Sequence, residues 1–100
     1  MKPTLERYVD DRLEDLEIDR QALGDMLGMS QSKLTRRLNY PGGWHAKELV
    51  NLIQALKIKN RWYEDLVVNF GIGKEQCTVA EYETLLKEEG HELGRVNIAA

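Results

Sequence analysis

The stretch that decides the fold is residues 19–39, with the sequence DRQALGDMLGMSQSKLTRRLN. Asp19 and Ser30 are favoured N-cap residues, because their side-chain oxygens can accept hydrogen bonds from the first helical amides. Gly28 can adopt the left-handed conformation that ends a helix. Leucines one helical turn apart mark an apolar face on each side of this glycine, namely Leu23 with Leu27 and Leu34 with Leu38. The pattern predicts two short helices joined by a tight turn.

Two short helices about a tight turn are typical of a helix-turn-helix, whose second helix enters the major groove of DNA. We expect that second helix to cover residues 31 to about 38. At roughly 100° per residue, its face opposite the leucines carries side chains that can donate hydrogen bonds, and none is acidic. These side chains are Ser32, Lys33, Thr35, Arg36 and Asn39, and Gln31 lies at the N-terminal end of the helix, where recognition helices commonly touch base edges. Arg36 can pair with guanine and Gln31 with adenine, each through two hydrogen bonds.

Two further arginines border this face. Arg20 begins the first helix, where its side chain and the helix amides are expected to meet a phosphate. Arg37 lies on the flank of the second helix. Two roles stay open for Arg37: contact with DNA, or pairing with an acidic residue of a neighbouring helix.

The rest of the chain also shows helical periodicity, interrupted by proline and glycine. The proline and two glycines at 41–43 predict a turn after the second helix. Thr78 and Glu81 have the spacing of a capping box, and Gly90 is the expected end of the helix that begins there. The segment 66–68 has two interpretations, part of a helix or a short strand. The other expected helices are residues 4–16, 20–27, 46–56 and 61–70.

The charge distribution reconciles an acidic chain with a nucleic-acid partner. The chain carries a formal net charge of −3, whereas nucleic-acid-binding domains are usually basic. Residues 1–19 have a net charge of −4, residues 20–47 of +4 and residues 48–100 of −3. Phosphate affinity depends on the local potential, and the basic segment coincides with the predicted helix-turn-helix. We therefore expect modest DNA affinity that falls quickly with added salt.

Composition excludes several classes of protein. Hydrophobic residues make up 42% and charged residues 31%, which is typical of a globular chain of 100 residues. No apolar run is long enough to span a bilayer and the charged N-terminus lacks a signal-peptide pattern, so we expect a cytoplasmic protein. Cys77 is the single cysteine, which excludes an intramolecular disulfide. We expect no metal, no cofactor and no enzymatic activity, because the sequence shows neither ligand spacing nor a nucleophile with a base.

Residues 5 to about 58 resemble the lambda-repressor-like, Cro/Xre-type helix-turn-helix domain. The matching residues are Leu23-Gly24, Leu27-Gly28-Met29-Ser30 and Leu34-Thr35-Arg36-Arg37-Leu38-Asn39, followed by a leucine-rich helix over residues 48–56. The resemblance implies a compact bundle of four or five helices that binds specific DNA sequences, usually as a dimer, in transcription regulation. It implies base contacts by Gln31, Ser32 and Arg36. It implies phosphate contacts by Arg20 and near Asn39 and Lys47.

The expected architecture is all-α and has two parts. Residues 1–57 form the helix-turn-helix DNA-binding domain, and residues 58–100 form a C-terminal helical extension that packs on it or mediates dimerisation. The expected partners are double-stranded DNA and a second copy of the chain. An alternative function is a protein-interaction module, or an antitoxin-like protein that binds a partner through the extension. This alternative depends on the acidic total and on the apolar residues of the extension, which include Trp62, Tyr63, Leu66, Phe70, Tyr82 and Leu86.

Overall fold

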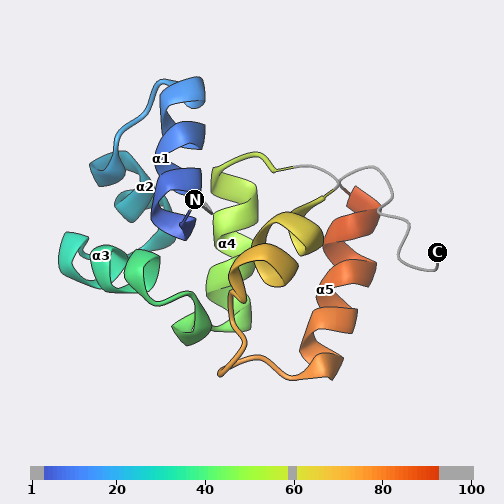
Figure 1. Ribbon diagram of the computed structural model, residues 1–100. Helices are drawn as coiled ribbons and strands as arrows, with labels where there is room; N and C mark the ends of the chain where they lie inside the picture. Colours follow the sequence, from blue (N-terminus) through green and yellow to red (C-terminus); the bar gives the residue numbers. More distant parts are fainter. Residues whose placement is uncertain (1–3, 59–60, 93–100) are drawn as a thin grey trace.

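The computed structural model describes residues 4–58 and 61–92, in which the secondary structure is helical and contains no strand (Figure 1). The elements in chain order are α1 (Leu5–Leu16), α2 (Arg20–Leu27), α3 (Gln31–Asn39), the short 3₁₀ turn η1 (Pro41–Gly43), α4 (Ala46–Ala55), the π-helical segment η2 (Tyr63–Val68) and α5 (Val79–Glu92). These helices pack into a compact bundle, which confirms the predicted all-α fold.

Helices α2 and α3 begin at caps that the sequence predicts, and α2 also ends at one. Asp19 accepts a hydrogen bond from the Ala22 N–H at 2.8 Å, and Ser30 accepts one from the Lys33 N–H at 3.2 Å. Gly28 ends α2 with a φ of 67°, a conformation that glycine adopts without the steric penalty of a Cβ. The tight turn between the two helices therefore follows from local chemistry.

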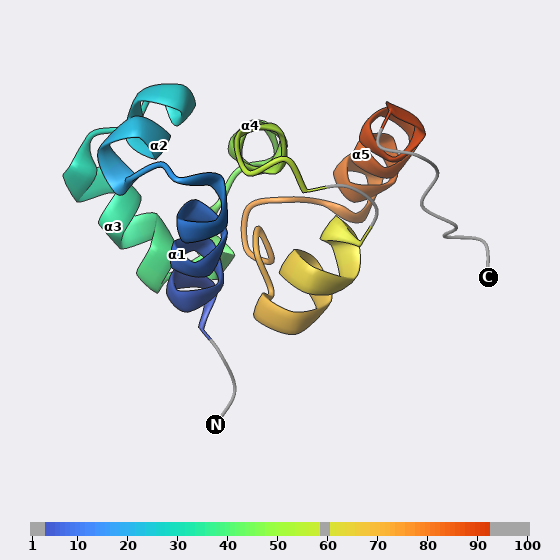
Figure 2. The ribbon, with the colours of Figure 1, turned by 90° about the horizontal axis from the view of Figure 1, so that it is seen from above.

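Helix α4 lies between two groups of helices, with α1, α2 and α3 on one side and η2 and α5 on the other (Figure 2). Its apolar residues Leu49, Leu52 and Ile53 are fully buried. Leu56 is the C-cap residue of α4. Arg12 of α1 donates a hydrogen bond to the carbonyl of Leu56 at 2.7 Å. Helix α4 is therefore the shared support for the rest of the bundle.

The described residues that follow α4 share the same hydrophobic core. Trp62, Leu66 and Ile72 are 0% exposed and belong to one cluster with the leucines of α2 and α3. Burying a side chain of this size stabilises the folded state by about 2 kcal/mol. This part of the chain packs on the helices before it, whereas its role in dimerisation stays a prediction.

Two expectations about the C-terminal part are corrected. The alternative of a short strand at residues 66–68 is wrong, because these residues belong to η2. A strand there would need a partner strand for its backbone groups, and none exists among residues 4–58 and 61–92. Gly90 does not end the last helix, because α5 continues to Glu92. A glycine inside a helix costs only about 1 kcal/mol relative to alanine, so it does not end a helix by itself.

The turn before α5 is hydrogen-bonded to the turn that follows α3. The Gly73 N–H donates to the Pro41 carbonyl at 2.8 Å, and the Glu75 N–H donates to the Gly42 carbonyl at 3.1 Å. Gly73 has a φ of +74°, and a Cβ there would lie 2.8 Å from the sulfur of Cys77, so this turn requires glycine. The chain beyond α4 thus fixes the position of the C-terminal end of α3.

Ile72→Ala should lower the free energy of unfolding by about 2–5 kcal/mol, because it removes part of a fully buried side chain from the shared core. Val68→Ala, at a side chain that is 65% exposed, should change this free energy by less than about 0.5 kcal/mol. Urea unfolding followed by tryptophan fluorescence measures both changes. Equal stability of Ile72→Ala and the wild type would place this residue outside the cooperative core.

Candidate nucleic-acid interface

The outer face of α3 carries polar side chains that have no partner within the described part of the chain. Leu34 and Leu38 are buried, and they turn the opposite face of the helix to solvent. Ser32, Thr35 and Arg36 lie on this opposite face at helical spacing and are exposed. Within residues 4–58 and 61–92, none of these three side chains makes a hydrogen bond or an ion pair. Their hydrogen-bonding groups are therefore available to a ligand.

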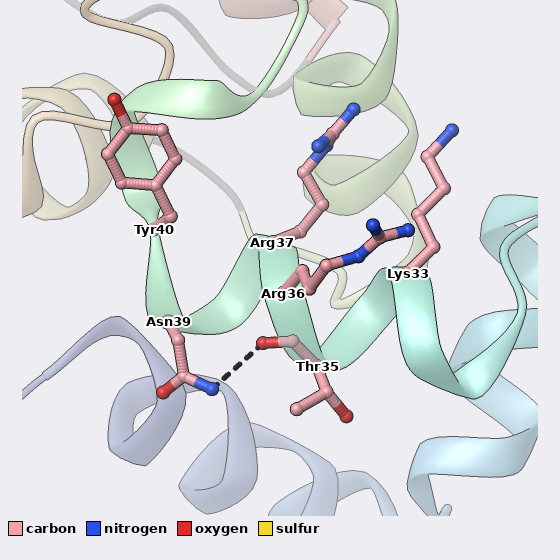
Figure 3. Close-up of a pocket in the computed structure, with 6 residues that line it drawn as sticks. All are labelled: Lys33, Thr35, Arg36, Arg37, Asn39 and Tyr40. Carbon is pink, nitrogen blue, oxygen red and sulfur yellow. Dashed lines mark hydrogen bonds between the residues drawn. The ribbon is translucent and has the colours of Figure 1, made fainter.

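A hollow of about 510 Å³ opens on the same part of α3 (Figure 3). Its lining residues are Lys33, Thr35, Arg36, Arg37, Asn39 and Tyr40. All six have a side chain that can donate a hydrogen bond, and three of them are cationic. Asn39 donates to the Thr35 carbonyl at 3.0 Å, which orients its amide along the helix. Such a surface is suited to an anion with several acceptor oxygens, such as a phosphate.

A single carboxylate of α4 holds two of these cations. Glu48 accepts hydrogen bonds from Arg37 Nε at 3.0 Å and Arg37 Nη2 at 3.3 Å, and Lys33 Nζ lies 3.3 Å from Glu48 Oε2. The Glu48 side chain is only 16% exposed, and that of Arg37 is 22% exposed. Of the two roles left open for Arg37, pairing with an acidic residue of a neighbouring helix is confirmed.

The Glu48 carboxylate is also fixed by the backbone of α4. Its Oε1 accepts a hydrogen bond from the His45 N–H at 2.9 Å, at the start of the helix. Burial alone would raise the pKa of Glu48, but hydrogen bonds from Arg37, the His45 N–H and Lys33 lower it overall. The carboxylate is therefore ionised at neutral pH and attracts both cations.

Arg20 is held by two carboxylates of α1. Its Nε donates to Asp10 Oδ1 at 2.9 Å, and its Nη2 donates to Asp10 Oδ2 at 2.7 Å and Glu6 Oε2 at 2.9 Å. Hydrogen bonding to Asp10 raises the pKa of the guanidinium, burial opposes this effect, and Glu6 adds to it. Arg20 joins α2 to α1, so a phosphate at this position would compete with two carboxylates. The predicted phosphate contact stays a prediction.

Two other predicted residues take different positions. The side-chain Nε2 of Gln31 donates to the Arg20 carbonyl at 3.0 Å, which ties the start of α3 to α2. Lys47 is exposed in the first turn of α4 but does not line the hollow. Of the predicted residues, those that line the hollow are Lys33, Thr35, Arg36, Arg37 and Asn39. Ser32 lies beside them on the same helix, and Lys47 lies apart on α4.

Two residues at the hollow or beside it, Tyr40 and Glu48, are not among the predicted site residues. Tyr40 is 54% exposed and lines the hollow, and its hydroxyl donates to Glu75 in the turn before α5. That hydrogen bond, with partial burial and the charge of Glu75, raises the pKa of Tyr40. Glu48 follows His45, the N-cap of α4, by three residues. Its spacing from the cap is visible in the sequence, but its contact with α3 is not.

Within residues 4–58 and 61–92, every helix is too short or too polar to span a lipid bilayer. In that part of the chain, no group of three or more His, Cys, Asp or Glu side chains is placed to hold a metal ion.

Comparisons of the chain with protein-family models, with curated proteins and with solved structures find no match. The resemblance of residues 5–58 to lambda-repressor-like domains therefore stays a prediction. The function must be inferred from the geometry of α3 and its surroundings.

Glu48→Gln should lower the free energy of unfolding by about 1–3 kcal/mol at pH 7, because it weakens hydrogen bonds that a negative charge strengthens. The pKa of Glu48 is lowered by folding. Its stabilisation is therefore present above the usual glutamate pKa of about 4.3 and is lost as the pH falls through the lower folded value.

Urea unfolding of both proteins at a series of pH values measures this effect. The stability difference should shrink as the pH falls below about 4. The control is Glu83→Gln at an exposed residue, which should change stability by less than about 0.5 kcal/mol at pH 7. A difference for Glu48→Gln that stays constant down to strongly acidic pH would contradict the role of its charge.

Proposed function

We propose that this protein binds double-stranded DNA through α3 in the major groove and acts as a transcriptional regulator. The observation that supports this most is the exposed face of Ser32, Thr35 and Arg36, which lacks partners within the described residues. A helix held at its ends by α2 and by the turn at Tyr40 presents this face as a rigid surface. The major groove, about 12 Å wide, admits a helix of this kind.

The chemistry of the face suits base recognition. The guanidinium of Arg36 can donate two parallel hydrogen bonds to the O6 and N7 atoms of guanine. Ser32 and Thr35 can donate to or accept from base edges, and the Thr35 methyl group can contact a thymine methyl. Gln31 would have to release the Arg20 carbonyl before pairing with adenine, which costs about 1 kcal/mol. We therefore assign the main base contact to Arg36.

The alternative of a protein-interaction module has less support. It depends on apolar residues beyond residue 57, but Trp62 and Leu66 are 0% exposed and lie within the core of the same chain. Tyr63 and Tyr82 are half-buried and pack against each other, with ring centroids 5.9 Å apart. These side chains are largely used inside the chain, so they offer little surface to a partner.

A selection from a pool of duplexes with a random central sequence tests the proposed function. Fluorescence anisotropy then compares the enriched duplex with the unselected pool at several salt concentrations. We expect salt-sensitive binding to both and tighter binding to the enriched duplex. Two half-sites about 10 base pairs apart in the enriched sequence would support binding as a dimer.

Arg36→Ala should weaken binding to the enriched duplex by about 10- to 100-fold, because it removes a two-hydrogen-bond contact to a base. The matched control is Arg61→Ala, which removes an arginine that is 76% exposed and lies outside α3. It should weaken binding by less than about 3-fold. The proposal would be overturned if the wild type showed no salt-sensitive binding, or if Arg36→Ala bound as tightly as the wild type.

A further inference from the structure

The three cations of α3 are not equivalent. Arg36 has no ion-pair partner among residues 4–58 and 61–92, whereas Lys33 and Arg37 both lie within 3.3 Å of Glu48. All three cations nevertheless line the same hollow (Figure 3). Lys33 and Arg37 are therefore positioned beside the predicted DNA surface, but both already pair with an internal carboxylate, which offsets one of their two charges.

We propose that Glu48 is a specificity-determining residue, which lowers sequence-independent DNA affinity by withholding Lys33 and Arg37 from the phosphates. This inference rests on the proposed DNA binding through α3. The attraction between cations and phosphates is the same for every sequence, whereas base contacts distinguish one sequence from another. Glu48 thus reduces the contribution of phosphate contacts to the affinity and leaves the base contact of Arg36 intact. The ratio of specific to non-specific affinity rises as a result.

The position of Glu48 makes its pairing with Arg37 persistent. The carboxylate is largely buried and is fixed by the His45 N–H at 2.9 Å, so it cannot follow a cation that moves toward DNA. A phosphate that attracts Arg37 must break its two hydrogen bonds to Glu48. The carboxylate would then remain buried with fewer donors, which is costly. Exposed ion pairs on mobile side chains would offer no such resistance.

The matched variants are Glu48→Gln and Glu81→Gln. Both remove one negative charge from the third residue of a helix. Both carboxylates also accept a capping hydrogen bond: the Thr78 N–H donates to Glu81 at 2.8 Å, as the His45 N–H donates to Glu48. Glu81 holds neither Lys33 nor Arg37. A difference between the two variants therefore reports the release of the α3 cations, separately from the loss of one charge or one cap.

Anisotropy titrations of the unselected duplex pool between 50 and 200 mM salt provide the measurement. For Glu48→Gln, the slope of log affinity against log salt should become steeper by about 1–2, at about 0.9 for each new phosphate contact. Each such contact makes the affinity fall about 3-fold further across this salt range. Preference for the enriched duplex over the pool should decrease. Glu81→Gln should keep the wild-type slope.

The double variant Glu48→Gln/Lys33→Gln completes the test. Lys33→Gln should change the slope more in the Glu48→Gln background than in the wild type, because there no carboxylate competes with a phosphate for Lys33. If a thermal melt shows that Glu48→Gln is not folded, the test uses single variants of the wild type. Lys33→Gln should then change the slope of log affinity against log salt by less than half as much as Arg36→Gln. Equal slopes for Glu48→Gln and Glu81→Gln, or equal effects of Lys33→Gln and Arg36→Gln, would overturn the inference. Absence of salt-sensitive binding by the wild type would instead refute the proposed function.

Discussion

The burial of α4 between two groups of helices is the constraint on which the rest of the structure depends. Leu49, Leu52 and Ile53 are removed from water, and α2 on one side and α5 on the other pack against this one support. Helix α3 buries Leu34 and Leu38 in the same core, so its opposite face has to be turned to solvent. The exposed face follows from packing and requires no separate device to present it.

The same helix also governs the charges beside α3. Glu48 lies in the first turn of α4, next to the first of the core residues that anchor this helix. An exposed ion pair contributes little because its side chains are mobile and solvated. A largely buried carboxylate that accepts from Arg37, Lys33 and the His45 N–H is held in one place. The electrostatic character of the α3 surface is therefore a consequence of how α4 packs.

Much of the fold could be predicted because its causes are local. Asp19, Ser30 and Gly28 act as the caps that their chemistry favours, and the apolar periodicity of α4 marks a helix that is buried. Local patterns were less informative where they conflict, as at Gly90, which lies inside α5. There a glycine lies within a long run of residues that favour helix. Its free-energy cost of about 1 kcal/mol relative to alanine is too small to end the helix.

The sequence by itself determined the helices, the tight turn and the face of α3 that carries hydrogen-bond donors, because helix hydrogen bonds and side-chain periodicity involve residues close along the chain. It also showed a basic segment from residue 20 to residue 47. Only the tertiary structure decided which of those charges remain exposed. Arg20 pairs with Asp10, and Arg37 pairs with Glu48, two acids that lie outside the basic segment. Such pairs form between helices, so they depend on how α1 and α4 pack against their neighbours and cannot be obtained by adding charges along the chain.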